Sequence, residues 1–138
     1  MHAKTAMRSE HSVERARLRK QILCMLDALN ECQWTRCAAL IDPKIHESRT
    51  FSESAYCLSL QRFMNQYGKI ELWHVRLSLH LPPHSNTRDS RPFAYASIVW
   101  KDAKHRFHMF RERWIKENDR WYSRVVGLIS HQDATSGG

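Results

Sequence analysis

Apolar residues recur along the first part of the chain with the spacing of a helix. Leu18, Ile22, Met25 and Leu29 follow one another at steps of three and four residues, which places them on one stripe of a helix. The pattern predicts one long helix that begins near Val13.

Two further helices are predicted before the pattern changes. The shorter covers residues 33–41 and ends at Asp42-Pro43, because the residue before a proline is driven out of the helical conformation. The longer begins after Ser52, a good N-cap, and ends at Gly68, a ready C-cap.

Beyond Gly68 the period becomes two, which is typical of half-buried strands. Residues 70–81 alternate apolar and polar side chains, which places Trp73, Val75 and Leu77 on the buried side. Three more strand-like runs follow at residues 93–101, 105–116 and 120–129, with short connections between them. These runs predict an antiparallel meander.

Short turns are predicted to set the register of this meander. The first, centred on residues 102–103, would place Ser97 opposite His108, and the next, centred on residues 118–119, would place Trp114 opposite Ser123. Since side chains alternate between faces, one face would hold Phe93, Tyr95, Ser97, His108, Phe110, Glu112, Trp114, Trp121, Ser123, Val125 and Gly127. The other face would hold Ala94, Ala96, Ile98, Phe107, Met109, Arg111, Arg113, Ile115, Tyr122, Arg124, Val126 and Leu128.

Three N-terminal helices followed by a curved antiparallel sheet of about four or more strands define an α+β fold, with helices on one face of the sheet. The 138 residues fit one domain. We expect it to span residues 13–130, between a flexible arm at residues 1–12 and a flexible tail at residues 131–138.

Two segments carry a resemblance to a known superfamily. Residues 34–43 (WTRCAALIDP) are similar to the second helix and following turn of nuclear-transport-factor-2-like (cystatin-like, SnoaL-like) proteins. Residues 111–128 (RERWIKENDRWYSRVVGL) are similar to their closing hairpin. The resemblance implies a cone-shaped fold with a pocket between sheet and helices. Its members include isomerases, dehydratases, cyclases, oxygenase subunits and non-catalytic transport or assembly domains, so the fold alone does not decide the function.

The predicted inner face supplies the candidate ligand-binding residues. Glu112 lies among apolar neighbours, where loss of hydration raises a carboxyl pKa and suits the group to proton transfer near neutral pH. Such a pocket would bind a small, partly apolar molecule, for isomerase, dehydratase or cyclase-like chemistry. Alternatively, Glu112 pairs with an arginine and the aromatic residues are core. The other candidate lining residues are His108, Tyr95, Ser97, Trp114 and, from the third helix, Tyr56.

Composition narrows the set of partners. The 22 Lys and Arg residues outnumber the 14 Asp and Glu residues, but no segment is dense enough in positive charge to favour nucleic-acid binding. The four cysteines lack zinc-site spacing and the histidines form no ligand set, so we expect no metal and no cofactor. No apolar run reaches the ~18 residues of a membrane span. We therefore expect a cytoplasmic protein without membrane contact.

The second face of the predicted sheet would expose apolar groups beside Arg111, Arg113 and Arg124, a pattern that suggests a partner. The resemblance implies sheet-to-sheet pairing. We therefore predict a homodimer through the sheet that buries ~800 Å² on each subunit. An open cavity that reaches Glu112 would favour the enzyme. A filled interior would favour a non-catalytic binding or assembly module that acts through its dimer or sheet surface.

Overall fold

Four helices precede four strands in the part of the chain that the structure, a computed structural model, describes, namely residues 2–81 and 91–124. The helices are α1 (His2–Asn30), α2 (Trp34–Ala38), α3 (Pro43–His46) and α4 (Glu53–Tyr67). The strands are β1 (Glu71–His80), β2 (Phe93–Lys101), β3 (Phe107–Glu117) and β4 (Arg120–Ser123). They form one antiparallel open sheet in the order β1-β2-β3-β4, so the predicted α+β class is confirmed.

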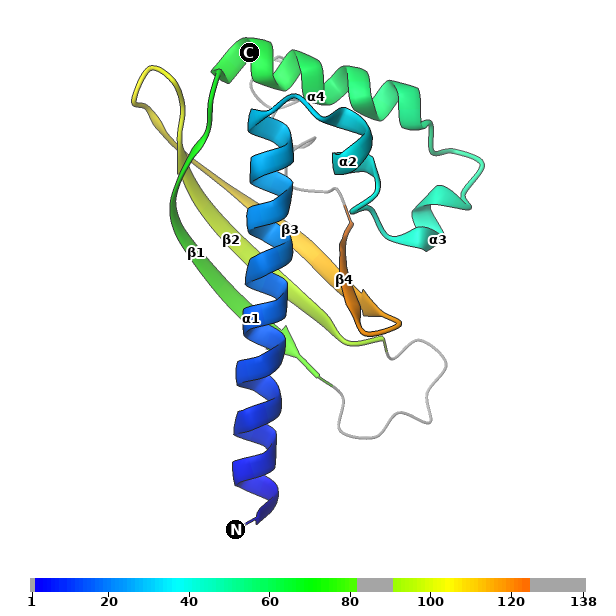
Figure 1. The fold of residues 1–138 in the computed structure, drawn as a ribbon, viewed down its shortest axis with the longest axis vertical. Helices are drawn as coiled ribbons and strands as arrows, with labels where there is room; N and C mark the ends of the chain where they lie inside the picture. Colours follow the sequence, from blue (N-terminus) through cyan, green and yellow to red (C-terminus); the bar gives the residue numbers. More distant parts are fainter. Residues whose placement is uncertain (1, 82–90, 125–138) are drawn as a thin grey trace.

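The helices lie against one face of the sheet. Figure 1 shows α1 running along that face and α4 crossing near the C-terminal end of α1, while the first turns of α1 extend past the sheet. We call the face toward α1 the inner face and the opposite face the outer face. Because successive side chains of a strand alternate, each strand contributes to both.

The first helix begins earlier than its apolar stripe. We predicted a start near Val13, but α1 begins at His2, within the predicted arm of residues 1–12. That segment contains Ala, Lys, Met, Arg and Glu, which favour helix without forming a stripe. The predicted tail at residues 131–138 lies outside the described residues.

Asp42-Pro43 separates two short helices where we predicted one. The polypeptide leaves α2 after Ala38, and the Asp42 side chain then accepts a hydrogen bond from the backbone N–H of Lys44 (3.1 Å). With Pro43 at the first helical position, Asp42 therefore caps α3. Helix α2 thus ends at Ala38, earlier than predicted, and Asp42-Pro43 starts a further helix, so the described residues contain four helices where we predicted three.

Helix α4 has both predicted caps. Ser52 Oγ accepts from the N–H of Ala55 (3.2 Å), and Gly68 follows the helix with a φ of 72°. The N–H of Gly68 donates to the carbonyl of Met64 (2.8 Å).

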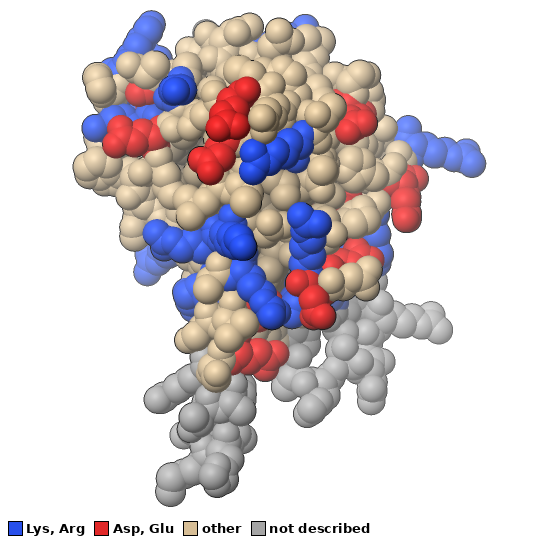
Figure 2. Space-filling view, in the orientation of Figure 1, with Lys and Arg blue, Asp and Glu red and all other residues tan. Residues whose placement is uncertain are grey.

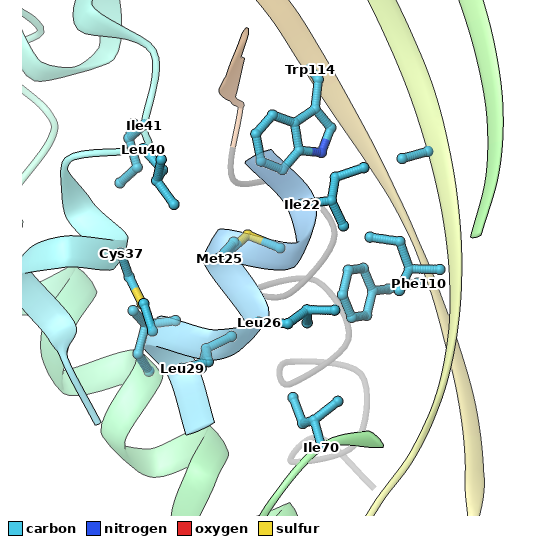
Figure 3. Close-up of a cluster of buried hydrophobic side chains, with 14 of the residues drawn as sticks. Ile22, Met25, Leu26, Leu29, Cys37, Leu40, Ile41, Ile70, Phe110 and Trp114 are labelled. Atoms are coloured by element: carbon cyan, nitrogen blue, oxygen red, sulfur yellow. The ribbon is translucent and has the colours of Figure 1, made fainter. Parts of the chain in front are cut away.

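Apolar side chains from α1 fill the space between the helices and the sheet. Leu18, Ile22 and Leu29 are fully buried, as the stripe predicts. In Figure 3, Ile22, Met25, Leu26 and Leu29 of α1 lie among Phe110 and Trp114 of β3, Ile70, and Cys37, Leu40 and Ile41 from the α2 region.

Polar side chains fasten α1 to the sheet near both ends of its buried stretch. Trp121 Nε1 donates to the Glu14 carboxylate (2.8 Å), which Lys116 also approaches (3.0 Å). Asn30 donates to the carbonyl of Ile70 and accepts from its N–H, each at 2.8 Å. These contacts fix the position of α1 relative to both β1 and the β3–β4 hairpin.

A β-bulge changes the faces of the first strand. The register between β1 and β2 shifts between Leu72 and His74, so Trp73 leaves the alternation and is 60% exposed. We predicted that Trp73 shares the buried side of Val75 and Leu77. The bulge instead turns the indole toward the outer face, where it contacts Phe107 (ring centroids 5.2 Å apart).

We expect Gly68→Ala to lower the free energy of unfolding by about 2 kcal/mol. Gly68 has a positive φ, and a Cβ at this position would lie 2.6 Å from Cβ of Ala103. Urea denaturation measures the loss, and the same change in an Ala103→Gly background is the matched control. The loss should be smaller in that background, because the contact is removed while the strained φ remains. Equal losses in both backgrounds would contradict the close approach of α4 to the β2–β3 turn.

Candidate functional site

Glu112 lies on the inner face of β3, where it is only 1% exposed. Ser123 Oγ of β4 donates a hydrogen bond to Glu112 Oε1, and Glu112 Oε2 has no hydrogen-bond partner among the described residues. Burial raises the pKa of Glu112 to about 7, against the opposing effect of the Ser123 hydrogen bond. The pKa of this buried carboxyl group therefore lies close to neutral pH.

Trp114 and Tyr56 accompany Glu112 in the interior. Trp114, two residues further along β3, is fully buried, and its Nε1 also lacks a partner within the described residues. Tyr56 reaches the interior from α4. Burial raises the pKa of Tyr56, and the charge of Glu112 raises it further. Three of the six candidate residues thus share one buried region.

Ser123 is brought to Glu112 by a pairing that sequence reasoning missed. The carbonyl of Leu40 accepts from the N–H of Ser123 (2.7 Å), and the N–H of Asp42 donates to the carbonyl of Ser123 (2.9 Å). Ile41 and Ser123 thereby form an isolated parallel bridge. The predicted pairing of Trp114 with Ser123 is confirmed.

Tyr95 and Ser97 do not join this site, because the predicted register of β2 and β3 is wrong. Ser97 lies opposite Arg111, three residues further along β3 than the predicted His108. An odd shift exchanges the two faces of β2. Tyr95 and Ser97 consequently point to the outer face, whereas Ala94, Ala96 and Ile98, predicted outside, are fully buried.

The cause of the shift is a longer turn closed by Asp102. Its side chain accepts from the backbone N–H groups of Lys104 (2.8 Å) and Arg106 (3.0 Å), so the loop runs from Asp102 to Arg106. The segment KDAKHR offers the signal, since Asp commonly accepts from backbone two residues later and so organises a turn of its own.

His108 belongs to the Asp102 turn, away from Glu112. Its Nε2 donates to Asp102 Oδ2 (2.8 Å), and its ring stacks on Trp100 (centroids 4.4 Å apart). Burial alone would raise the pKa of Asp102, but hydrogen bonds from His108, Arg106 and Lys104 outweigh it and hold that pKa below its usual range. This arrangement is a structural one that fastens the hairpin.

The inner surface around Glu112 is filled by large side chains. Trp100, Trp114, Trp121 and Phe63 are each at most 1% exposed. One cavity of about 390 Å³ is lined by Tyr95, Arg111, Glu112 and Arg113. Since three of these residues point outward and Glu112 is 1% exposed, this cavity is a hollow of the outer face.

The outer face combines exposed apolar and basic side chains. Trp73, Phe107 and Met109 are 60%, 55% and 58% exposed. The Arg111 guanidinium lies 4.6 Å from the Tyr95 ring centroid and that of Arg113 lies 4.8 Å from the Phe93 centroid.

A second polar cluster surrounds Asp42, which is fully buried. Arg91 donates to its Oδ1 (2.9 Å) and Arg124 to its Oδ2 (2.6 Å). Burial opposes the effect of these arginines, which together hold the pKa of Asp42 below its usual value. The cluster joins the α2–α3 connection to the segment before β2, through Arg91, and to the residue after β4, Arg124, and so it fastens these parts of the fold together.

The cysteines divide by exposure. Cys37 is 1% exposed, and burial raises the pKa of its thiol to about 12, which makes it a poor nucleophile. Cys32 is exposed. Within residues 2–81 and 91–124, no group of three or more His, Cys, Asp or Glu side chains is arranged to hold a metal ion. None of the described helices has the length and apolar character of a membrane span.

We expect the stability of the protein to depend on pH through Glu112. A carboxyl whose pKa is raised from 4.5 to about 7 on folding binds its proton more tightly in the folded state, so the free energy of unfolding falls as the pH rises through this interval. Glu112→Gln removes this component and keeps an acceptor for Ser123. The variant should gain stability relative to the wild type by roughly 3 kcal/mol between about pH 5 and pH 8, measured by urea denaturation. Parallel pH profiles for the two proteins would contradict a buried titrating Glu112.

Comparisons of the chain with protein-family models, with curated proteins and with solved structures find no match.

Proposed function

We propose that this protein is a non-catalytic binding module whose working surface is the outer face of the sheet. The observation that carries the proposal is the difference in exposure of large side chains between the two faces. Trp100 and Trp114 of the inner face are fully buried, whereas Trp73 and Phe107 of the outer face are more than half exposed. Large exposed apolar groups contribute little to folding and commonly mark a contact with another molecule.

The burial of the Glu112 side chain supports a binding module over an enzyme. A general acid or base must come within hydrogen-bond distance of the reacting group. The Glu112 side chain is 1% exposed, one of its oxygens is bonded to Ser123, and the hollow nearest to it opens on the other face of the sheet. A substrate would have to displace core side chains to reach it.

Membership of the nuclear-transport-factor-2-like superfamily, with its cone-shaped fold, belongs to the same proposal. Its support is the likeness of residues 34–43 and 111–128, together with an α+β order of helices followed by a four-stranded antiparallel sheet. A homodimer formed through the sheet would be one use of the outer face, and cytoplasmic location stays a prediction.

The outer face can be tested without knowing its partner. We expect tagged wild-type protein either to co-purify with a bound partner or to self-associate, as light scattering would measure. The triple variant Trp73→Ser, Phe107→Ser, Met109→Ser should abolish this association. Glu112→Gln is the control for the interior and should retain the association. All three substituted side chains are exposed, so the thermal unfolding of the triple variant should remain close to that of the wild type. Association that survives the triple substitution, or is lost in Glu112→Gln, would overturn the proposal.

A second candidate function is small-molecule binding with proton transfer at Glu112. It is favoured by one observation: Glu112 Oε2 and Trp114 Nε1, a possible acceptor and donor two residues apart on one strand face, both lack partners among the residues described. A ligand or a water molecule could bridge them.

Thermal-shift screening against small carbonyl and aromatic compounds tests this second candidate. It predicts a stabilising compound whose effect disappears in Glu112→Gln. The binding-module proposal predicts that any shift is the same in both proteins.

A further inference from the structure

We propose that the outer face of the sheet binds single-stranded nucleic acid. This inference rests on the proposed function, which makes the outer face the working surface, and it names the class of partner. Such partners are held by two kinds of group, namely flat side chains on which bases stack and cations that contact the phosphates.

Flat side chains stand toward both ends of the outer face. At one end, Trp73 and Phe107 are in contact and more than half exposed. At the other end, Phe93 and Tyr95 lie side by side, with ring centroids 5.8 Å apart, and His80 stacks on Phe93 at 4.6 Å. The Trp73–Phe107 pair offers exposed aromatic surface to a base, and at the other end the exposed ring of that trio is His80, which covers the half-buried Phe93.

Cations lie in the middle of the face and beside both of these aromatic platforms. The register places Ser97 opposite Arg76 of β1 and Arg111 of β3, so the two arginines lie in one row of the sheet, on either side of Ser97. Arg113 lies in the next row, opposite Tyr95. About 20 Å of strand separates Phe107 from Arg113 at the usual rise per residue, a length that several nucleotides could follow.

Cations of the outer face lie over its aromatic rings. Arg111 lies over the Tyr95 ring, Arg113 over Phe93, and Lys101 stands 5.0 Å from the Trp73 ring centroid and 5.1 Å from that of Phe107. A guanidinium close to an aromatic ring is held in place at the surface, where it can contact a phosphate or stack on a base.

Negative charge is confined to the edges of this face. Among the outward positions of the described strands, the acidic residues are Glu71 at the start of β1 and Glu117 at the end of β3, and Glu117 accepts from Arg91 (2.9 Å). On the helical side, by contrast, Figure 2 shows Lys and Arg interspersed with Asp and Glu. The outer face is therefore the more uniformly positive of the two regions compared.

Charge complementarity favours nucleic acid over other occupants. A second copy of the chain would bring one set of arginines toward another, with a net charge of +8 on each molecule. An acidic protein segment would satisfy the arginines but leave the aromatic platforms without a use. Single-stranded nucleic acid accounts for both kinds of side chain.

Fluorescence anisotropy with a labelled single-stranded RNA of about ten nucleotides tests the inference. We expect binding that weakens steeply between about 50 and 200 mM salt. Phe107→Leu should weaken binding roughly tenfold, and Phe107→Tyr, which restores a ring, should recover it. Arg111→Gln should lower the slope of log affinity against log salt by about 0.7. Arg19→Gln, a change at an exposed cation of α1, is the matched control and should leave affinity unchanged.

Three results would overturn the inference: no binding at low salt, equal affinity for a duplex of the same sequence, or affinity that Phe107→Leu and Arg111→Gln leave unchanged. The duplex matters because its paired bases cannot stack on the rings. Should RNA fail to bind while the triple outer-face variant still loses its association, the nucleic-acid partner is wrong and the binding-module proposal stands. If both experiments fail, both proposals fall.

Discussion

The buried carboxylate of Asp102 is the interaction on which the arrangement of this protein depends. It accepts hydrogen bonds from two backbone N–H groups, from Arg106 Nε and from His108 Nε2, all within 3.0 Å. These bonds close a loop from Asp102 to Arg106 and so determine which residue of β3 lies opposite each residue of β2. Because a sheet alternates its side chains, that single register decides which groups are buried under the helices and which face outward.

The two faces that result have different chemical characters. The inner face is a dense apolar layer of tryptophans and small β2 residues, in which Glu112 is a buried carboxyl group, bonded to Ser123, with a pKa near neutrality. The outer face keeps its rings and cations accessible. A protein that used its interior for catalysis would be expected to leave a route to its carboxyl group, and here the room is taken by side chains. This difference is why we propose the outer face, and not the interior, as the binding surface.

Sequence patterns predicted the elements of the fold well and the face assignments only in part. The stripe on α1, the caps Ser52 and Gly68, and the turn at residues 118–119 that pairs Trp114 with Ser123 depend on local chemistry and were found. The register of β2 depends on how many residues a turn contains, and an error of an odd number reverses a strand. The bulge at Trp73 and the pairing of Leu40 with Ser123 arise from tertiary contacts that no local pattern records. The outward positions of Arg111 and Arg113 beside apolar groups were predicted. Arg76 of β1 and Lys101 of β2 were not assigned to that surface, because cations that come from three strands form no run in the sequence.

Hydroxyl-radical footprinting of the protein with and without single-stranded RNA tests the central claim most directly. In the free protein, we expect rapid oxidation of Trp73, Phe107 and Met109 and protection of Trp100 and Trp114, because the register places the first three outside and the last two in the core. Addition of RNA should protect Trp73, Phe107 and Tyr95 and leave exposed residues of α1 unchanged. Rapid oxidation of Trp114 in the free protein, or protection by RNA confined to the helical side, would contradict the account.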